Sequence, residues 1–242
     1  MSYSQRLLKQ GNSLTRLAHR SRFDAVLNIL DNHKYKQALD FGCADGLLLK
    51  TAYDRGIIYS GIGVDVDDSM LLSCQTTFKN INEFQFLTPN EMTQKISPQS
   101  CDLILCTETL EHIGYPAKAL DLMLSYCQSG AKIIISVPIE IGPSLFFKQI
   151  VRYFANLKGD YGHEKYTLKE LFLAAILWDT DHFSSSHLIS SEYTGHKGFD
   201  YRKIEKLLQE KLKIEQTIFS PFSWSRNILN STVIWVCTVE II

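Results

Sequence analysis

Apolar and polar residues follow one another along this chain at two different spacings, which predict helices and strands in alternation. Residues 13–31 carry an apolar stripe at the i, i+3, i+4 and i+7 positions of one helical face, formed by Phe23, Val26, Leu27 and Leu30. The apolar runs that follow are short, and helical patterns separate them, as is typical of buried parallel strands joined by crossover helices. We expect these strands at residues 38–41, 61–65, 83–87, 101–106 and 131–137.

The segments between the strands predict helices. One helix covers residues 46–55, and another follows Asp67 or Asp68, either of which suits a helix N-cap. A later helix runs over residues 116–127, and we expect Gly130 to end it, because glycine is common just after a helix.

The alternation stops after the fifth strand. Residues 138–198 predict helices at 145–158 and 167–178 but no strand, which we interpret as an insertion. A further amphipathic helix and two strands, at 212–219 and 232–241, close the chain. The pattern predicts an α/β fold with a doubly wound, mostly parallel seven-stranded sheet, helices on both faces and a helical insertion after the fifth strand. We expect an N-terminal helical lid or extension, a main domain, and a substrate-side insertion within it, at residues 1–35, 36–242 and 138–197.

The composition narrows the class of protein. A chain of 242 residues, 45% hydrophobic, can bury one substantial core, so we expect one domain with an insertion. Lys and Arg number 25 against 26 Asp and Glu, so the whole chain has no net positive charge to attract nucleic acid. We therefore do not expect a nucleic-acid partner. The six cysteines contain no Cys-x-x-Cys pair, and neither a signal peptide nor a membrane-spanning run is present. We therefore expect a cytoplasmic protein.

The first strand runs into a turn that contains Gly42 and Gly46 and opens onto a helix. Glycine allows the backbone to approach a ligand closely in such a turn. Asp65 follows the second strand, where a carboxylate can accept both hydroxyls of a ribose. The Gly-x-x-x-Gly spacing differs from the Gly-x-Gly-x-x-Gly of a dinucleotide site, and Asp40 and Asp45 would repel a pyrophosphate. A nucleoside with a cationic group suits this turn better.

The residues Leu39-Asp40-Phe41-Gly42-Cys43-Ala44-Asp45-Gly46 resemble the first motif of the class I S-adenosylmethionine-dependent methyltransferases, with Ala44 in the place of the usual middle glycine. The resemblance implies that Asp40 contacts the methionine and ribose parts of the cofactor, that Asp65 holds the ribose and that Val66 packs on adenine. Thr88 or Asn90 is the candidate for the adenine amine. The cofactor-binding set that it implies is Asp40, Gly42, Cys43, Ala44, Gly46, Asp65, Val66, Thr88 and Thr107.

A second candidate group follows the fourth strand, where Glu108, Glu111 and His112 share one face if the segment turns helically. This Glu-x-x-Glu-His pattern resembles that of ubiquinone-pathway O-methyltransferases and small-RNA 2′-O-methyltransferases, in which it supplies metal ligands. The resemblance implies a divalent metal such as Mg²⁺, with His163 as the best-placed fourth ligand.

The same ending also occurs in relatives that hold no metal, in which the histidine orients or deprotonates the acceptor and a glutamate contacts the cofactor. On that alternative His112 and Glu108 are the catalytic candidates. The histidines at positions 182, 187 and 196 either line an acceptor pocket or lie solvated in a loop.

The resemblance implies methyl transfer from S-adenosylmethionine to an oxygen, nitrogen or carbon nucleophile. The base candidate His112, and the absence after the fourth strand of the Asn/Asp-Pro-Pro-Tyr motif that resembles amino-group methyltransferases, favour an oxygen of a small-molecule, glycan or lipid-linked acceptor. Two alternatives stay open: a metal-assisted RNA 2′-O-methyltransferase, and a non-catalytic cofactor-binding partner subunit. A nicotinamide oxidoreductase is disfavoured by the missing second glycine of the dinucleotide turn. The basic and aromatic helix at 145–158 leaves peripheral membrane contact open, and no pattern indicates the oligomeric state.

Overall fold

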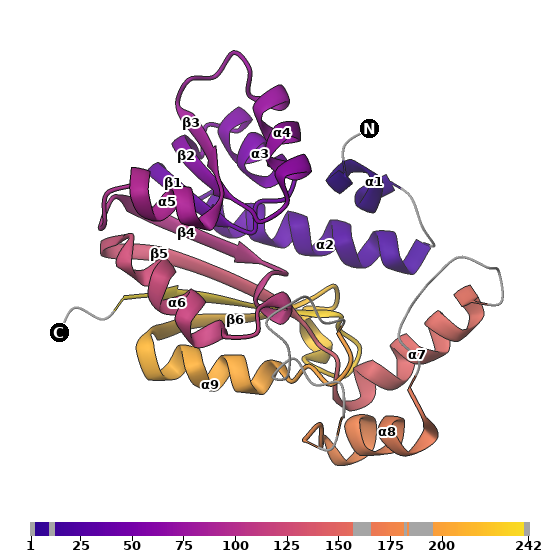
Figure 1. Cartoon of the computed structure of the whole chain (residues 1–242). Coiled ribbons are helices and arrows are strands. Elements are labelled where there is room, and N and C mark those ends of the chain that lie inside the picture. The colour runs from indigo at the N-terminus through magenta and orange to yellow at the C-terminus, as the bar shows by residue number, and fades with distance from the viewer. Residues whose placement is uncertain (1–2, 10–12, 157–165, 182, 184–195, 240–242) are drawn as a thin grey trace.

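The computed structural model describes residues 3–9, 13–156, 166–181, 183 and 196–239. Its centre is a seven-stranded sheet with the order β3-β2-β1-β4-β5-β7-β6, in which β7 runs antiparallel to both of its neighbours, β5 and β6, and the other pairs are parallel (Figure 1). The strands are β1 Tyr35–Phe41, β2 Ile58–Val64, β3 Phe84–Leu87, β4 Cys101–Thr107, β5 Cys127–Pro138, β6 Lys213–Ser220 and β7 Thr232–Thr238. The predicted doubly wound, mostly parallel sheet is confirmed.

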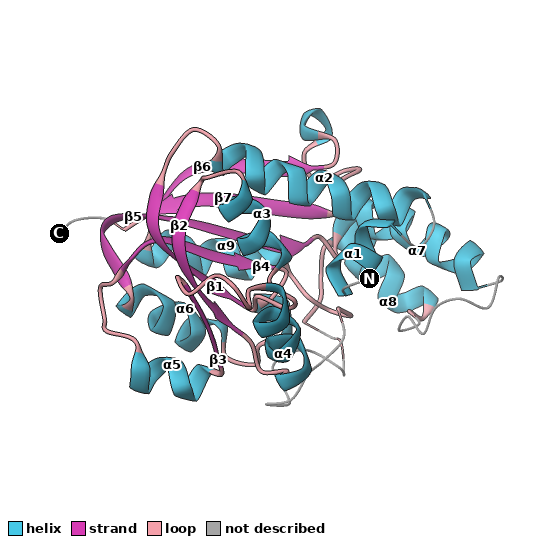
Figure 2. Ribbon diagram, turned by 90° about the horizontal axis from the view of Figure 1, so that it is seen from above, coloured by secondary structure: helices cyan, strands magenta, loops and turns pink. Residues whose placement is uncertain are grey.

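Helices cover both faces of the sheet, as Figures 1 and 2 show. Residues of α2, α3, β1 and β2 form the hydrophobic core on one face, and residues of α5, α6, α9, β4, β5 and β7 form the core on the other. The helices are α1 Tyr3–Lys9, α2 Ser13–Leu30, α3 Leu47–Asp54, α4 Asp68–Thr77, α5 Pro89–Lys95, α6 Pro116–Ser125, α7 Gly142–Asn156, α8 Leu168–Phe172 and α9 Tyr201–Lys211. None of the helices in the described ranges is both long and apolar enough to cross a membrane.

Side chains at the helix ends explain where the helices begin. Asp67 caps α4 by accepting from the Ser69 N–H, and Asp200 caps α9 by accepting from the Arg202 N–H. At α5, Thr88 and Glu91 form a capping box that satisfies two backbone N–H groups. These polar pairs place the loops at the carboxyl edge of the sheet, where open α/β sheets hold their ligands.

The prediction that Gly130 ends the helix at 116–127 was wrong. The helix α6 ends at Ser125, and Gly130 lies within β5 with φ of +75°. The register between β4 and β5 moves from Cys101 opposite Cys127 to Leu103 opposite Lys132, so β5 accommodates extra residues there. Gly130 allows this bulge, because its positive φ is unfavourable for a residue with a Cβ.

The segment between β5 and α9 contains helices and no strand among its described residues. The helix α7 begins at Gly142, earlier than the predicted 145–158, and residues 157–158 lie outside the described part. The helix α8 passes into one π-helical turn, η2, at Leu173–Leu177, which ends at Trp178 in a left-handed conformation. The last predicted strand, 232–241, is observed as Thr232–Thr238, with residues 240–241 outside the described part.

Candidate active site

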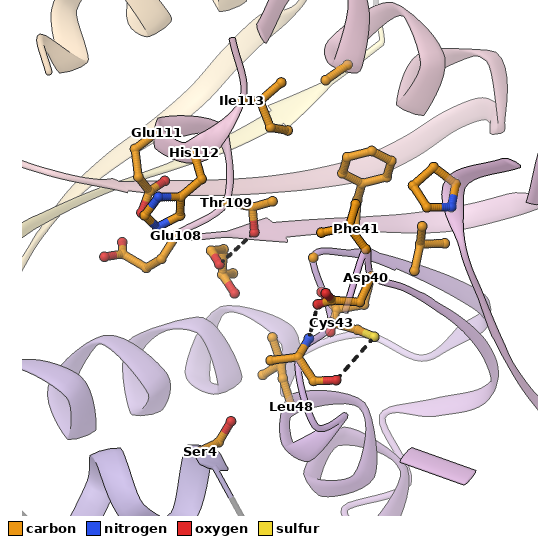
Figure 3. A pocket seen from close by; sticks show the side chains of 18 of the residues that line it. Ser4, Asp40, Phe41, Cys43, Leu48, Glu108, Thr109, Glu111, His112 and Ile113 are labelled. Carbon is orange, nitrogen blue, oxygen red and sulfur yellow. Dashed lines mark hydrogen bonds and ion pairs between the residues drawn. The ribbon is translucent and has the colours of Figure 1, made fainter. Parts of the chain in front are cut away.

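One large cavity lies at the carboxyl edge of β1, β2 and β4. Its volume is about 1070 Å³, and its lining comes from the turn after β1, the segment after β4, the helices α1 and α2, and His196 of the segment before α9. Figure 3 shows Asp40 and Cys43 on one side of this space and Glu108 and His112 on the other. The sheet thus brings the two candidate groups of the sequence to opposite walls of one cavity.

The turn after β1 has three left-handed residues, which lets its backbone face the cavity. Gly42 has φ of +83°, and a Cβ there would overlap the Thr109 side chain, so the turn and the segment after β4 pack directly on each other. Gly46 is the N-cap residue of α3 with φ of +72°. Ala44 adopts φ of +47° even though it carries a Cβ, and this conformation is strained for a non-glycine residue.

Asp65 ties the second strand to this turn. Its Oδ2 accepts the Ala44 N–H at 2.8 Å, and its Oδ1 accepts the Asp67 N–H at 3.0 Å. Asp65 lines the cavity, and Val66 beside it is 82% exposed. This carboxylate can meet two adjacent hydroxyls while it holds the turn, and the exposed Val66 offers an apolar surface for a base.

Asp40 is a buried carboxyl group that faces the cavity. Only 2% of it is exposed, and within the described part of the chain its Oδ1 has no hydrogen-bond partner. Burial, together with the nearby charge of Asp65, raises the pKa of Asp40 to about 7. A cationic ligand in the cavity would supply the missing partner.

Only some of the other predicted cofactor residues line the cavity. Cys43 and Thr107 line the cavity, whereas Gly46 and Thr88 do not. The Thr88 hydroxyl belongs to the capping box of α5, and the adjacent Pro89 is the residue of that loop that reaches the cavity.

Glu108 is held by an arginine from the N-terminal helices. Arg22 of α2 lies 2.9 Å from one carboxylate oxygen, and the Ser136 hydroxyl donates to the other at 3.2 Å. Arg22 also donates to Nδ1 of His19 at 3.3 Å. The Glu108 carboxylate is therefore engaged by α2 and β5, and it is not among the three residues whose ligand atoms come together.

Glu111, His112 and His196 form the group that could hold a metal ion among the described residues. One ligand atom from each lies within 4.8 Å of the others, and the rings of His112 and His196 are 5.0 Å apart. Glu111 is fully buried and, in the described ranges, no hydrogen bond reaches its carboxylate. Burial, with the charge of Glu108 second, raises its pKa well above the ordinary range, so an adjacent cation would relieve a real electrostatic cost.

This group differs from the predicted metal set. His196 takes the place expected for a distant histidine, Glu108 pairs with Arg22, and His163 lies outside the described residues. The donors present fit a divalent ion in number and separation. Two imidazoles and one carboxylate are the donor set that zinc and other transition metals use, whereas Mg²⁺ prefers oxygen ligands.

A buried charge cluster fixes His196 beside His112. Glu140, after β5, is 1% exposed and accepts from Lys148 at 2.9 Å and from both terminal nitrogens of Arg152 at 2.9–3.0 Å. Nδ1 of His196 lies 3.9 Å from the same carboxylate. Burial lowers the pKa of His196 to about 4 despite Glu140, so the ring is neutral at pH 7 and is a weaker base than an ordinary histidine.

The sequence predicts an N-terminal helical lid at residues 1–35 but not the polar contacts that α1 and α2 make at the cavity. Ser4 of α1 donates from its N–H to Asp45 at 2.7 Å and from its hydroxyl to the same carboxylate. Arg22 and Phe23 of α2 reach the cavity as well. The apolar stripe of residues 13–31 predicts the helix but carries no signal for these polar contacts.

The family comparison identifies the domain. Residues 14–173 match the model of a family described as a methyltransferase domain. The match begins in α2 and ends in η2, so it includes the turn after β1 and the segment after β4, but neither α1 nor His196.

Curated relatives are similar over part of the chain. Ubiquinone biosynthesis O-methyltransferase of Aeromonas salmonicida is 26% identical over 136 residues, which are 54% of this chain and 56% of that protein. The protein of the same name from Coxiella burnetii is 32% identical over 108 residues, 43% of this chain and 44% of its own. The matched region thus spans about half the length of these relatives.

Solved structures share the fold at low sequence identity. The N-methyltransferase NodS of Bradyrhizobium japonicum, in complex with S-adenosyl-L-homocysteine, has a TM-score of 0.59 at 12% identity, covering 98% of this chain and 97% of that one. A Haloferax volcanii complex of the Trm112 methyltransferase activator and a methyltransferase contains a chain with a TM-score of 0.59 at 12% identity, covering 93% and 91%. These likenesses extend over the whole sheet and its helices.

Proposed function

This chain belongs to the class I S-adenosylmethionine-dependent methyltransferases, and from that premise we propose that it transfers the cofactor's methyl group to an oxygen of a small-molecule, glycan or lipid-linked acceptor. The observation that carries the proposal is that Asp40 and Asp65 line the same cavity as the His112 and His196 pair.

The wall formed by the turn after β1 suits the cofactor. When bound, S-adenosylmethionine supplies a methyl group on a positively charged sulfur, open to in-line attack. Asp65 holds the ribose hydroxyls, and Val66 covers the base. Asp40 compensates the positive charge of the ligand, which returns its pKa toward the ordinary range. Cys43, Ala44 and Thr107 complete the cofactor side of the cavity.

The opposite wall suits a hydroxyl acceptor. His112 takes the proton of the acceptor hydroxyl as its oxygen attacks the methyl carbon, and the neutral His196 holds the same or a neighbouring oxygen. Glu108 acts as a positioning residue, because Arg22 and Ser136 occupy its carboxylate. The helices α1 and α2 serve as the lid of the 1–35 extension, and the 138–197 insertion supplies His196.

The acceptor class is tested with methyl-labelled S-adenosylmethionine and a cell extract divided into nucleic acid, protein and solvent-extractable fractions. The proposal predicts label in a solvent-extractable or small polar product as an alkali-stable methyl ether, and at least a hundredfold less label with His112→Ala, on the order expected for loss of a general base. Label in RNA would favour the RNA 2′-O-methyltransferase. No label in any fraction, with intact cofactor binding, would favour the non-catalytic cofactor-binding partner subunit.

A divalent metal is a second candidate element of this site, supported by the three ligand atoms within 4.8 Å of one another. Glu111, His112 and His196 would hold the ion, which would lower the pKa of a bound acceptor hydroxyl. Zinc, manganese and magnesium are to be titrated separately by calorimetry. The donor set predicts the order zinc, manganese, magnesium in affinity and loss of binding in His196→Ala. Equal heats of metal binding for wild type and His196→Ala would show that these residues hold no metal ion, and His112 would keep its proposed role as base.

We place the protein in the cytoplasm. The support is chemical: all six cysteines are buried and free, as expected in a reducing compartment.

A further inference from the structure

The helix α7 has an unusual orientation for an amphipathic helix. Its charged residues Lys148 and Arg152 turn inward to the buried Glu140. Its outward positions at i, i+4 and i+7 are Phe146, Ile150 and Tyr153, which are 41–63% exposed. An amphipathic helix of a protein that meets only water presents the opposite arrangement. The exposed apolar stripe therefore indicates a nonaqueous contact.

The neighbouring helix continues this exposure. In α8 and the π-turn η2 after it, large apolar side chains recur at i, i+4 and i+8 with exposures of 54–88%, at Leu168, Phe172 and Ile176. The elements are neighbours, because η2 packs against both α7 and α8. Tyr3 of α1 and Leu17 of α2 are also about 40% exposed. Contiguous exposed apolar side chains on this scale mark a binding surface.

Positive charge is concentrated on α1 and α2. The chain has no Asp or Glu before Asp24, and in that stretch Arg6, Lys9, Arg16 and Arg20 are all exposed. Figures 1 and 2 both place α1, the Ser13 end of α2, α7 and α8 at one end of the molecule. Burial lowers the pKa of His19 on α2 to about 4, and the nearby charges of Arg22 and of Lys148 on α7 add to this shift. The net charge of the whole chain, −1, conceals this local concentration.

We propose that the end of the molecule formed by α1, α2, α7 and α8 binds the surface of an anionic lipid bilayer, with the apolar side chains of α7 and α8 entering the interface and the arginines of α1 and α2 meeting the headgroups. A bilayer fits both features, since interfacial binding combines apolar burial with attraction to anionic lipids. A second copy of the chain fits less well, because a two-fold contact would bring these cations against one another.

Such docking would place the cavity beside the bilayer. Tyr3, Leu8 and Arg22 line the cavity from α1 and α2, the helices that also carry the basic residues. An acceptor held in the membrane would reach the His112 wall without crossing water. This consequence of docking rests on the methyltransferase function proposed above. The vesicle measurement itself needs no acceptor and no cofactor.

The test is co-sedimentation of the full chain with vesicles of phosphatidylglycerol and phosphatidylcholine in equal parts, and with vesicles of phosphatidylcholine alone. We expect binding to the anionic vesicles that weakens with salt. Phe147, whose ring lies 6.1 Å from that of Phe146, is also 47% exposed, and the variant Phe146→Ser/Phe147→Ser/Ile150→Ser should lose about a hundredfold or more in affinity. The variant Arg16→Gln/Arg20→Gln should lose about fivefold for each cation. The matched control, Tyr59→Ser/Leu72→Ser, removes side chains of similar exposure, 61% and 64%, from β2 and α4 and should bind as wild type does.

Three results would overturn the proposal: no binding of wild type to anionic vesicles, equal binding by the triple-serine variant, or self-association that the triple-serine variant abolishes while vesicles stay unbound. Calorimetry with S-adenosylmethionine on the same variants keeps the two proposals separate. Cofactor binding without vesicle binding would contradict the bilayer-binding proposal alone. Vesicle binding without cofactor binding would contradict the proposed methyl transfer alone.

Discussion

At the scale of single residues, the chain departs from its family at Ala44. The middle position of the motif holds a residue with φ of +47°, and its N–H is nevertheless held by Asp65 at 2.8 Å. Because the left-handed conformation costs a residue with a Cβ about 1 kcal/mol more than glycine, we expect Ala44→Gly to raise the free energy of unfolding by about 0.5–1 kcal/mol.

Urea unfolding of the ligand-free chain measures this change. The matched control is Ala117→Gly on the exposed face of α6, which should lower the same free energy by up to about 1 kcal/mol. A loss of stability in Ala44→Gly would show that the turn is not strained.

Asp40 couples cofactor binding to pH. Its pKa of about 7 in the folded chain exceeds the ordinary value of 3.8, so the neutral form is favoured by folding and the charged form by a cationic ligand. We therefore expect the affinity for S-adenosylmethionine to fall below pH 7 and binding near pH 6–7 to release a proton. Calorimetry in buffers of different ionisation enthalpy detects this proton. An affinity independent of pH between 6 and 8 would contradict this role of Asp40.

Ionisation of Asp40, which favours cofactor binding, destabilises the folded chain when no ligand is bound. The contribution of the neutral carboxyl group is fully present below pH 3.8 and is lost as the pH rises through 7, up to a limit on the order of 4 kcal/mol. Asp40→Asn should therefore be more stable than wild type at pH 8 without ligand, yet bind the cofactor more weakly. Thermal unfolding with and without S-adenosylmethionine gives both quantities.

At the scale of elements, α7 depends on a buried ion cluster. Removing Glu140 would take from Lys148 and Arg152, each only 20% exposed, the buried carboxylate that they share, so we expect Glu140→Ala to lower the free energy of unfolding by about 3 kcal/mol. Glu215→Ala is the control, because its pair with Lys132 joins partly exposed side chains and should cost under about 1 kcal/mol.

The pH dependence of this cluster has a defined sign. Burial opposes ionisation of Glu140, but Lys148 and Arg152 overcome it and lower the pKa to about 2. The stability that Glu140 adds is present above pH 4.5 and is lost as the pH falls through 2. Chemical denaturation of wild type and Glu140→Ala across this range measures it, and a constant difference between them would contradict the assignment.

At the scale of the whole molecule, the sequence predicts the sheet well because each buried strand is a continuous apolar run and each crossover helix has its own stripe. The turn at Gly42 and the carboxylate at Asp65 are likewise local signals. Gly130 was misjudged because a bulge depends on the register between β4 and β5, and that register is set by residues far along the chain.

The polar part of the site was less predictable for the same reason. Glu108 has metal-ligand spacing in the sequence, but Arg22 of a distant helix takes its carboxylate. His196 could not be separated from the other loop histidines, because Glu140 and the fold of α7 bring it to His112. Contacts of this kind join segments far apart in the chain, and no local sequence pattern predicts them.

Calorimetric titration of the chain with S-adenosylmethionine, S-adenosylhomocysteine and NAD tests the cofactor site most directly. We expect micromolar binding of the first two, about −8 kcal/mol, and none of NAD. Asp65→Ala should abolish this binding, while Asp68→Ala, an exposed carboxylate of α4 outside the cavity lining, should leave it unchanged. No binding of either sulfur nucleoside by the wild-type chain, or equal binding by Asp65→Ala, would contradict the claim that the turn after β1 is the cofactor site.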